Sequence, residues 1–546
     1  MTATEQGIML DQARIDAMTR GGHWPNRTIL DYLDDALGER PDQIFVTDYN
    51  SATGRSTSLS YRQLDRLSRR IAGGLQALGI ARGDVVALQL PNWWEFAAVH
   101  IACVRIGAIT NPLQPIFRER ELEFMLSFAN ARAFFVPREF RGHRYLPMAD
   151  ELAANIPSLQ NVFACGGDPS DERSFERAFL ERRWEDEISP DANPLAPNDV
   201  AEICYTSGTT GQPKGVMHTY NTLVACTGAT HSLGFSEHSV IHMASPLAHQ
   251  TGFLFGFLLP MLHGARAVFQ DVWDPAVAAR IIHDERVTFT MGATPFLSDL
   301  SGTDALTKYP TESLELFICA GAPIPRVLAQ TAAQRLGARI CSGWGMSENG
   351  LVTATQIGDP PEKVFGTDGT GWAGQTVRVV GDDGQPVSPN TPGTLQTRGA
   401  ANFVGYLKRP EAYDVDADGW FNTGDIASMD EDGYIRITSR AKDIIIRGGE
   451  NVPVVEIEEL LYRHASVQDA AVVAMPDPRL GERGCAFVAT RPGHTLTFED
   501  MQAYFESERL AKHYWPERLE LVDEFPRTPS GKIQKYLLRE RAASLE

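Results

Sequence analysis

One stretch of the chain, YTSGTTGQPKG from Tyr205 to Gly215, contains the residue types that surround phosphate oxygens. Its glycines tolerate positive φ, and its Ser and Thr side chains can hydrogen-bond to nearby backbone, so the stretch predicts a loop. The loop fails the GxxxxGK[ST] pattern because, counting from Gly208, Pro213 stands where the second glycine belongs. A flexible linker has a similar composition. The strand-like run before the loop (200–205) and the clustered hydroxyls favour a phosphate-binding loop.

Three further segments carry charged side chains that could serve a nucleotide. Glu348 ends WGMSE after a strand-like run, and a carboxylate at the end of a parallel strand suits Mg²⁺ held against phosphates. Asp425 ends FNTGD, where an acid after a tight turn can accept both hydroxyls of a ribose. Lys532 lies in a second Gly/Ser/Pro loop, PRTPSGK. Taken singly, the three are equally well a solvated glutamate at a helix start, a turn aspartate and a basic tail.

The composition limits the class of protein. With 546 residues and 43% hydrophobic content, the chain can form several domains, each with its own core. Its net charge of −20 argues against a general binder of nucleic acid or anionic membranes. The seven cysteines lack CxxC spacing and are expected to be buried thiols in a reducing compartment. No secretory segment opens the chain, and its most apolar run (253–262) is too short to span a membrane, so we expect a cytoplasmic protein.

Expected helices and strands alternate along most of the chain. A Ser-x-x-Gln capping box at Ser60 opens a helix whose apolar residues repeat every three or four positions. Val85–Leu90 is expected to be a strand and 93–106 a helix, and this βαβ pattern recurs. The further expected strands are 200–205, 240–244, 265–269, 287–291, 314–320 and 338–341. These features predict an α/β fold with a large N-terminal domain of mostly parallel sheets.

The pattern changes near residue 440. Short hairpin-like runs at 433–438 and 443–447 come first. A helix at 455–463, strands at 470–474 and 485–490, and a second helix near 498–507 are expected after them. This order predicts a compact α+β domain of roughly a hundred residues. We therefore divide the chain into an N-terminal domain (1–440) and a C-terminal domain (441–546).

In this order, the segments together resemble the adenylate-forming superfamily of acyl-CoA synthetases, nonribosomal adenylation domains and beetle luciferases. The resemblance covers nearly the whole chain, from about residue 30 to 540. YTSGTTGQPKG resembles the family's phosphate loop, AGAP (320–323) its adenine-binding segment, WGMSE its YGxTE motif and FNTGD its ribose motif. SRAKD resembles the hinge region and PRTPSGK the loop with the catalytic lysine. Trp344, Ser347 and Ser439 stand where the family usually has Tyr, Thr and Gly.

The resemblance implies a large ATP- and acyl-binding domain, a small mobile domain that carries the catalytic lysine, and roles for individual residues. Lys532 would bridge the carboxylate and the α-phosphate, Glu348 would bind Mg²⁺, Arg440 would contact ribose or phosphate, and His249 would occupy the gate position. The implied ATP-binding residues are Thr206, Ser207, Gly208, Thr209, Thr210, Gly211, Lys214, Gly321, Ala322, Pro323, Trp344, Gly345, Met346, Ser347, Asp425 and Arg440. The implied acyl pocket is His249, Thr251, Phe253, Gly292, Ala293, Gly321 and Gly345. The implied CoA channel is Arg447, Gly448, Gly449 and Glu450, and the implied hinge residue is Lys442.

The implied activity is that of an ATP-dependent acid–CoA ligase, which forms an acyl-AMP and pyrophosphate and then transfers the acyl group to CoA. The segment at the gate (246–256) contains no acid that could pair with an amino group, so an apolar carboxylic acid is expected. PLAHQTGF, MGATPF and LGERGCAF resemble cyclohexanecarboxylate–CoA ligases and short- to medium-chain fatty acyl-CoA synthetases. Three alternatives stay open: a ligase that loads a carrier-protein phosphopantetheine, a luciferase-type oxygenase, and a nucleotide-binding regulator without catalysis. A homodimer is the default oligomeric state.

Overall fold

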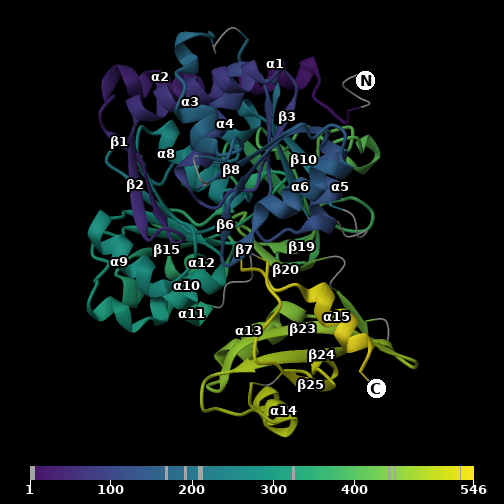
Figure 1. Cartoon of the computed structure of the whole chain (residues 1–546). Helices are drawn as coiled ribbons and strands as arrows, with labels where there is room; N and C mark the ends of the chain where they lie inside the picture. Colours follow the sequence, from purple (N-terminus) through teal and green to yellow (C-terminus); the bar gives the residue numbers. More distant parts are fainter. Residues whose placement is uncertain are drawn as a thin grey trace.

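The computed structural model describes residues 6–166, 170–189, 193–206, 213–321, 326–440, 444–447, 450–508, 510–528 and 531–545. Within these ranges, three large sheets form before residue 441 and one further sheet forms after it. In Figure 1 the later sheet and its helices form a separate, smaller lobe, drawn in yellow-green. The predicted α/β class, with a large N-terminal domain and a smaller C-terminal domain, is confirmed.

The largest sheet has the strand order β16-β15-β14-β13-β11-β12-β1-β2. All neighbours from β15 to β1 are parallel, whereas the edge strands β16 and β2 run antiparallel. Helices follow most of the parallel strands, which is the predicted βαβ alternation. The strands are β1 (Ile44–Asn50), β2 (Arg55–Ser60), β11 (Val240–Met243), β12 (Arg266–Gln270), β13 (Phe289–Gly292), β14 (Leu316–Ala320), β15 (Arg339–Met346) and β16 (Gly350–Ala354).

A second sheet, β10-β9-β4-β3-β5-β8, packs beside the first and shares its main apolar core. Its strands are β3 (Val85–Leu88), β4 (Ile109–Pro112), β5 (Ala131–Pro137), β8 (Asn161–Cys165), β9 (Val200–Thr206) and β10 (Lys214–Thr219). A small ribbon joins β6 (Glu139–Phe140) to β7 (His143–Arg144). The expected phosphate loop thus lies between β9 and β10, a pair of antiparallel strands, as the strand-like run before it suggested.

The helices of the larger region start and end where local sequence dictates. The expected capping box is present, because Ser60 Oγ accepts from Gln63 N and Gln63 Oε1 accepts from Ser60 N. The helices are α1 (Gln12–Arg20), α2 (Ile29–Glu39), α3 (Tyr61–Ala77), α4 (Trp94–Ile106), α5 (Glu119–Ala129), α6 (Tyr145–Asn155), α7 (Tyr220–Ala225), η4 (Gly252–Leu258), α8 (Leu259–Leu262), α9 (Pro275–Glu285), α10 (Thr294–Gly302), α11 (Arg326–Leu336) and α12 (Pro361–Gly366). None of the helices within the described ranges combines the length and apolar content that crossing a bilayer requires.

A third sheet, β17-β18-β19-β20, ends the larger region. Its antiparallel strands are β17 (Gln375–Val380), β18 (Gly393–Gly399), β19 (Phe421–Met429) and β20 (Ile435–Arg440). The hairpin-like run at 433–438 therefore includes the first part of β20, which pairs with β19.

The smaller region is a four-stranded path, β22-β21-β24-β23, with β25 added parallel to β24. Its strands are β21 (Ile445–Arg447), β22 (Glu450–Val452), β23 (Val467–Asp477), β24 (Gly481–Thr490) and β25 (Arg518–Leu521). Its helices are α13 (Val454–Arg463), α14 (Phe498–Ser507) and α15 (Lys535–Ala543). Apolar clusters of its own lie on both faces of the β23–β24 pair, as expected for a separate α+β unit.

Candidate active site

Four predicted segments lie at the carboxyl ends of four adjacent parallel strands. His249 follows β11, Gly292 ends β13 and Ala293 follows it, Gly321 follows β14, and the WGMSE segment begins within β15 and continues past its end at Met346. These strands are consecutive neighbours in the largest sheet. Because ligands of parallel α/β sheets bind at the carboxyl edge, this edge is the natural site for a substrate.

Glu348 lies just beyond β15 and is only 6% exposed. The Tyr406 hydroxyl donates a 2.8 Å hydrogen bond to Glu348 Oε1. Burial and the charge of Glu348 both raise the pKa of Tyr406, so the phenol stays protonated and remains a donor. Lys214 Nζ lies 4.8 Å from the centroid of the same tyrosine ring. Tyr406 therefore contacts both Glu348 and Lys214, the lysine that follows the expected phosphate loop.

Glu348 fits the magnesium role that the sequence suggested. Among the described residues no three His, Cys, Asp or Glu side chains gather as a metal site. Mg²⁺ in nucleotide enzymes commonly takes one or two protein carboxylates and fills its remaining positions with phosphate oxygens and water. The buried carboxylate of Glu348, oriented by Tyr406, matches that donor set.

Asp425 is held against Trp344, so the ribose motif and the WGMSE motif meet. Trp344 Nε1 donates a 3.0 Å hydrogen bond to Asp425 Oδ2, and the aspartate is 2% exposed. The Asp425 N–H in turn donates to Thr423 Oγ1 at 3.1 Å. A tryptophan at position 344 therefore supplies an N–H that orients the carboxylate, as well as an aromatic face.

Lys532 comes from the smaller region and lies over Gly321. Its own loop is closed by two hydrogen bonds, from Thr528 N to Lys532 O at 2.8 Å and from Lys532 N to Thr528 Oγ1 at 3.1 Å. A β-carbon placed on Gly321 would lie 3.2 Å from Lys532 Cε, and one on Gly531 would lie 3.3 Å from Phe296 Cε2. Gly321 also has φ +90, a backbone conformation that favours glycine.

His249 faces the same lysine. Burial and the positive charge of Lys532 lower the pKa of His249 to about 3, so its imidazole is neutral at physiological pH. Its Nδ1 accepts a 3.2 Å hydrogen bond from Thr251 N, which leaves the proton on Nε2. The arrangement gives a neutral imidazole and an ammonium group at one edge of the sheet.

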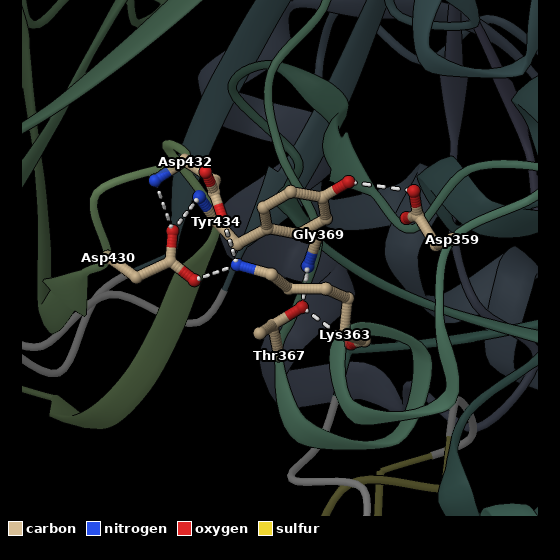
Figure 2. Close-up of polar contacts among 7 residues, drawn as sticks. All are labelled: Asp359, Lys363, Thr367, Gly369, Asp430, Asp432 and Tyr434. Atoms are coloured by element: carbon tan, nitrogen blue, oxygen red, sulfur yellow. Dashed lines mark hydrogen bonds and ion pairs between the residues drawn. The ribbon is translucent and has the colours of Figure 1, made fainter.

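The strand that ends at Arg440 is firmly attached to the larger region. Figure 2 shows Lys363, from α12, between Asp430 and Asp432 of the β19–β20 turn, with both Nζ–Oδ2 distances 2.7 Å. Tyr434 OH donates to Asp359 Oδ1 at 2.7 Å, and its ring lies under Lys363 Nζ. These contacts fix the last strand before the expected hinge.

One ion pair crosses from that strand to the smaller region. Arg436 of β20 pairs with Glu459 of α13, and both side chains are less than 20% exposed. The same guanidinium lies 3.8 Å from Asp368 Oδ1 of the larger region. Arg436 therefore has one acid on each side of the expected hinge.

Several predicted residues lie outside the described structure. These are Ser207, Gly208, Thr209, Thr210 and Gly211 of the phosphate loop, Ala322 and Pro323, the expected hinge residue Lys442, and Gly448 and Gly449, together with the side chains of Arg440 and Glu450. Of the remaining ones, Phe253 is fully buried against His100 and Phe96, and Arg447 pairs with Glu517. The glycines at 292 and 345 sit in close contacts, with Phe296 and the Gly350 carbonyl respectively, that leave no room for a β-carbon.

Sequence reasoning missed three buried side chains in or beside the predicted segments: Tyr406, which hydrogen-bonds to Glu348, and the hydrogen-bonded pair Glu202 and Gln250. Tyr406 is a lone tyrosine in NFVGYLKRP, and no local pattern ties it to Glu348, 58 positions away. Glu202 was the one detectable signal, since an acid in the middle of an apolar strand needs a buried partner.

Comparison with known proteins identifies the family of the chain. The family model described as "AMP-binding enzyme" matches residues 33–407, and "AMP-binding enzyme C-terminal domain" matches residues 456–532. A medium-chain fatty-acid–CoA ligase of Escherichia coli K12 is 37% identical over 97% of this chain and 93% of its own. A salicyl-AMP ligase / salicyl-S-ArCP synthetase of Mycobacterium tuberculosis is 34% identical over 94% and 90%. The crystal structure of ATP-bound MatB from Rhodopseudomonas palustris superposes with a TM-score of 0.83 at 26% identity, covering 95% of this chain and 99% of that one.

The fold and the grouped carboxylates and lysines thus define an adenylate-forming ligase, an enzyme that uses ATP to activate an acid. The chain belongs to the AMP-binding enzyme family, as an AMP-forming acid–thiol ligase of the acyl-CoA synthetase class.

Proposed function

We propose that the protein is an ATP-dependent acid–CoA ligase for an apolar carboxylic acid, alicyclic or of short to medium chain length. The observation that carries the proposal is the position of Lys532 over Gly321, at the edge that also bears His249 and Glu348. A cation there can neutralise charge between an acid and a nucleotide phosphate, which is the difficulty of the first reaction step.

In the first step the carboxylate oxygen attacks the α-phosphorus of ATP, and the bond from that phosphorus to the bridging oxygen breaks to release pyrophosphate. Lys532 neutralises the two anions as they approach. Asp425 accepts the ribose hydroxyls, and Lys214 with the 206–211 segment holds the leaving phosphates. Mg²⁺ on Glu348 would supply further charge neutralisation when bound.

In the second step the CoA thiol attacks the acyl carbonyl and AMP leaves. Lys532 must first withdraw, because it occupies the space beside the acyl group. We place the domain boundary between residues 440 and 441, so that rotation about Lys442 removes Lys532. The same rotation would bring Arg447, Gly448, Gly449 and Glu450 to the thiol channel.

The acid is proposed from the chemistry of the pocket walls. The turn and helix after β11 contain no acidic side chain between 246 and 256, and the other expected wall residues, Gly292, Ala293, Gly321 and Gly345, are small. The medium-chain fatty-acid–CoA ligase relative supports an aliphatic substrate. An apolar pocket distinguishes neighbouring chain lengths by only about 1–3 kcal/mol per methylene, so a range of acids should react. The seven buried, free cysteines suit a cytoplasmic enzyme.

A carrier-protein acceptor is the second candidate, and it rests on the salicyl-S-ArCP synthetase relative. ATP–pyrophosphate exchange across a panel of aliphatic, alicyclic and aromatic acids tests the first step. Detection of a free CoA thioester without any carrier protein tests the second. Absence of exchange with every apolar acid would refute the proposal, whereas exchange without a CoA thioester would favour the carrier.

A further inference from the structure

The turn that carries His249 is tied down by two buried side chains from other elements. Asn92 Oδ1 accepts from Leu247 N at 2.8 Å, and Asn92 Nδ2 donates to Ser245 O at 2.9 Å. At the other end of the turn, Gln250 Nε2 donates to Glu202 Oε2 at 2.7 Å. Gln250 directly follows His249, so the second tie acts next to the gate residue.

Glu202 and Gln250 form a pair sealed from water. Glu202 is 1% exposed and Gln250 is 4% exposed. Glu202 lies on β9, the strand that leads into the expected phosphate loop, so the pair joins that strand to the gate turn. Gln250 Oε1 is also buried and has no hydrogen-bond partner among the residues that the structure describes. Burial raises the pKa of Glu202 to about 8, and a protonated carboxyl has an O–H available for such an acceptor.

The groups around Glu202 offer little to stabilise a negative charge. Cys204 lies on β9 with Glu202, Tyr220 lies on α7, and Cys226 directly follows α7. Burial raises the pKa of all three side chains. His218 lies opposite on β10, and His100 of α4 contacts Tyr220. Burial lowers the pKa of His218 to about 4 and that of His100 to about 3, so both are neutral. The charge of Arg14 lowers the pKa of Cys226 and of His218 and does not contribute to the pKa of Glu202.

We propose that Glu202 is a positioning residue for the first reaction step, because its buried carboxyl holds Gln250 by a hydrogen bond and thereby fixes the turn from which His249 faces Lys532 and the acyl group. The inference rests on the proposed function. An ionised Glu202 would lose its O–H and place a charge in a site sealed from water. The Gln250 N–H would still donate to it, but the cost of burying the charge would loosen the turn.

Two variants of Glu202 test the role, both measured by ATP–pyrophosphate exchange so that the CoA thiol does not contribute. In the wild type, KM for the acid should rise as pH increases from 7 to 9, while KM for ATP changes little. Glu202→Gln should remain within about twofold of wild type at pH 7 and should lose that rise. Glu202→Ala should raise KM for the acid about tenfold at every pH, the loss expected for one buried hydrogen bond of about 1.4 kcal/mol.

Glu95→Gln is the matched control. Burial also raises the pKa of Glu95 to about 8, but this residue lies on α4 beside Asp48. A carboxyl whose pKa is raised in the folded state keeps its proton up to a higher pH than it does in the unfolded chain. The free energy of unfolding therefore falls as pH rises from about 4.5 to about 8. Glu202→Gln and Glu95→Gln should each remove one such pH-dependent decrease in the free energy of unfolding, measured with urea. Only Glu202→Gln should change the pH dependence of KM.

Equal KM profiles for the two Gln variants, or an unchanged KM for the acid in Glu202→Ala, would overturn the inference. A second readout is independent of turnover. The ¹³C–¹H NMR signal of the His249 imidazole should shift in Glu202→Ala and stay in place in Glu95→Gln. If the wild type activates no acid, the proposed function fails, and the NMR comparison still decides whether Glu202 positions His249.

Discussion

The two sides of the candidate site are attached to the protein in very different ways. On one side, Glu348 and Asp425 are 6% and 2% exposed, and each is oriented by a buried side chain that comes from a distant strand or loop. On the other side, Lys532 is partly exposed on a loop of the smaller region, and that loop meets the larger region through contacts such as Gly531 against Phe296. The side with Glu348 and Asp425 is therefore built into the sheets, whereas Lys532 belongs to the smaller region, and we propose that it enters the site and can leave it.

The largest effect should come from removing the lysine. Lys532→Ala should lower ATP–pyrophosphate exchange by about 10²–10³-fold, because one preorganised charge at the reacting phosphate is lost. Thioester formation from supplied acyl-AMP should change little, since Lys532 has withdrawn by then. Rapid-quench assays of each half-reaction measure the two rates. Equal losses in both would mean that the lysine does not leave.

A smaller effect is expected on the side of the site that contains Asp425 and Trp344. Asp425→Asn should raise KM for ATP by about 10–100-fold, because hydrogen bonds to a charged group contribute about 1.5–3 kcal/mol. Trp344→Phe keeps the aromatic face and removes only the N–H that orients the carboxylate, so it should cost less, about 2–10-fold. The measurement is initial-rate kinetics with varied ATP. A larger effect of Trp344→Phe than of Asp425→Asn would contradict the positions that we assign.

The ion pair between Arg436 and Glu459 joins the larger region to the smaller region. Breaking it should change the rate of adenylation relative to the rate of thioester formation. Glu459→Gln leaves Arg436 with Asp368 and should slow adenylation by up to about fivefold, since such a pair contributes about 1 kcal/mol or less. Thioester formation should be unchanged or faster. Asp432→Asn is the control, because its pair with Lys363 lies wholly within the larger region. Identical effects of the two variants on both half-reactions would show that Arg436–Glu459 does not bias the domain arrangement.

The smallest expected effect is an absence of titration. Because the pKa of His249 is lowered to about 3, its imidazole should stay neutral between pH 5 and 8. Its ¹³Cε1 chemical shift should therefore remain constant across that range. A midpoint near 6.5, the ordinary value for histidine, would mean that the residue is solvated and not close to Lys532.

Much of this arrangement could be predicted from local sequence. Ser60 with Gln63 marks the start of α3, and apolar runs locate the parallel strands, because capping and burial act over a few residues. The order of motifs likewise indicated Glu348, Asp425 and Lys532. The hydrogen bonds that Tyr406 donates to Glu348 and that Gln250 donates to Glu202 could not be predicted, because each joins positions about fifty residues apart and depends on how strands pack. The approach of Lys532 to Gly321 depends in addition on how the smaller region is placed.

The most direct test of the central claim is the distance between the two regions during the reaction. Val327 on α11 and Tyr536 on α15 are 51% and 48% exposed and lie on opposite regions (Figure 1), whereas all seven cysteines are buried. Spin labels on Val327→Cys/Tyr536→Cys can be measured by double electron–electron resonance. We predict one distance distribution with ATP and a non-reactive acid analogue, and a clearly different one with acyl-AMP and CoA. The same distribution in both states would contradict the proposal that Lys532 is in the site for the first step and withdraws before the second.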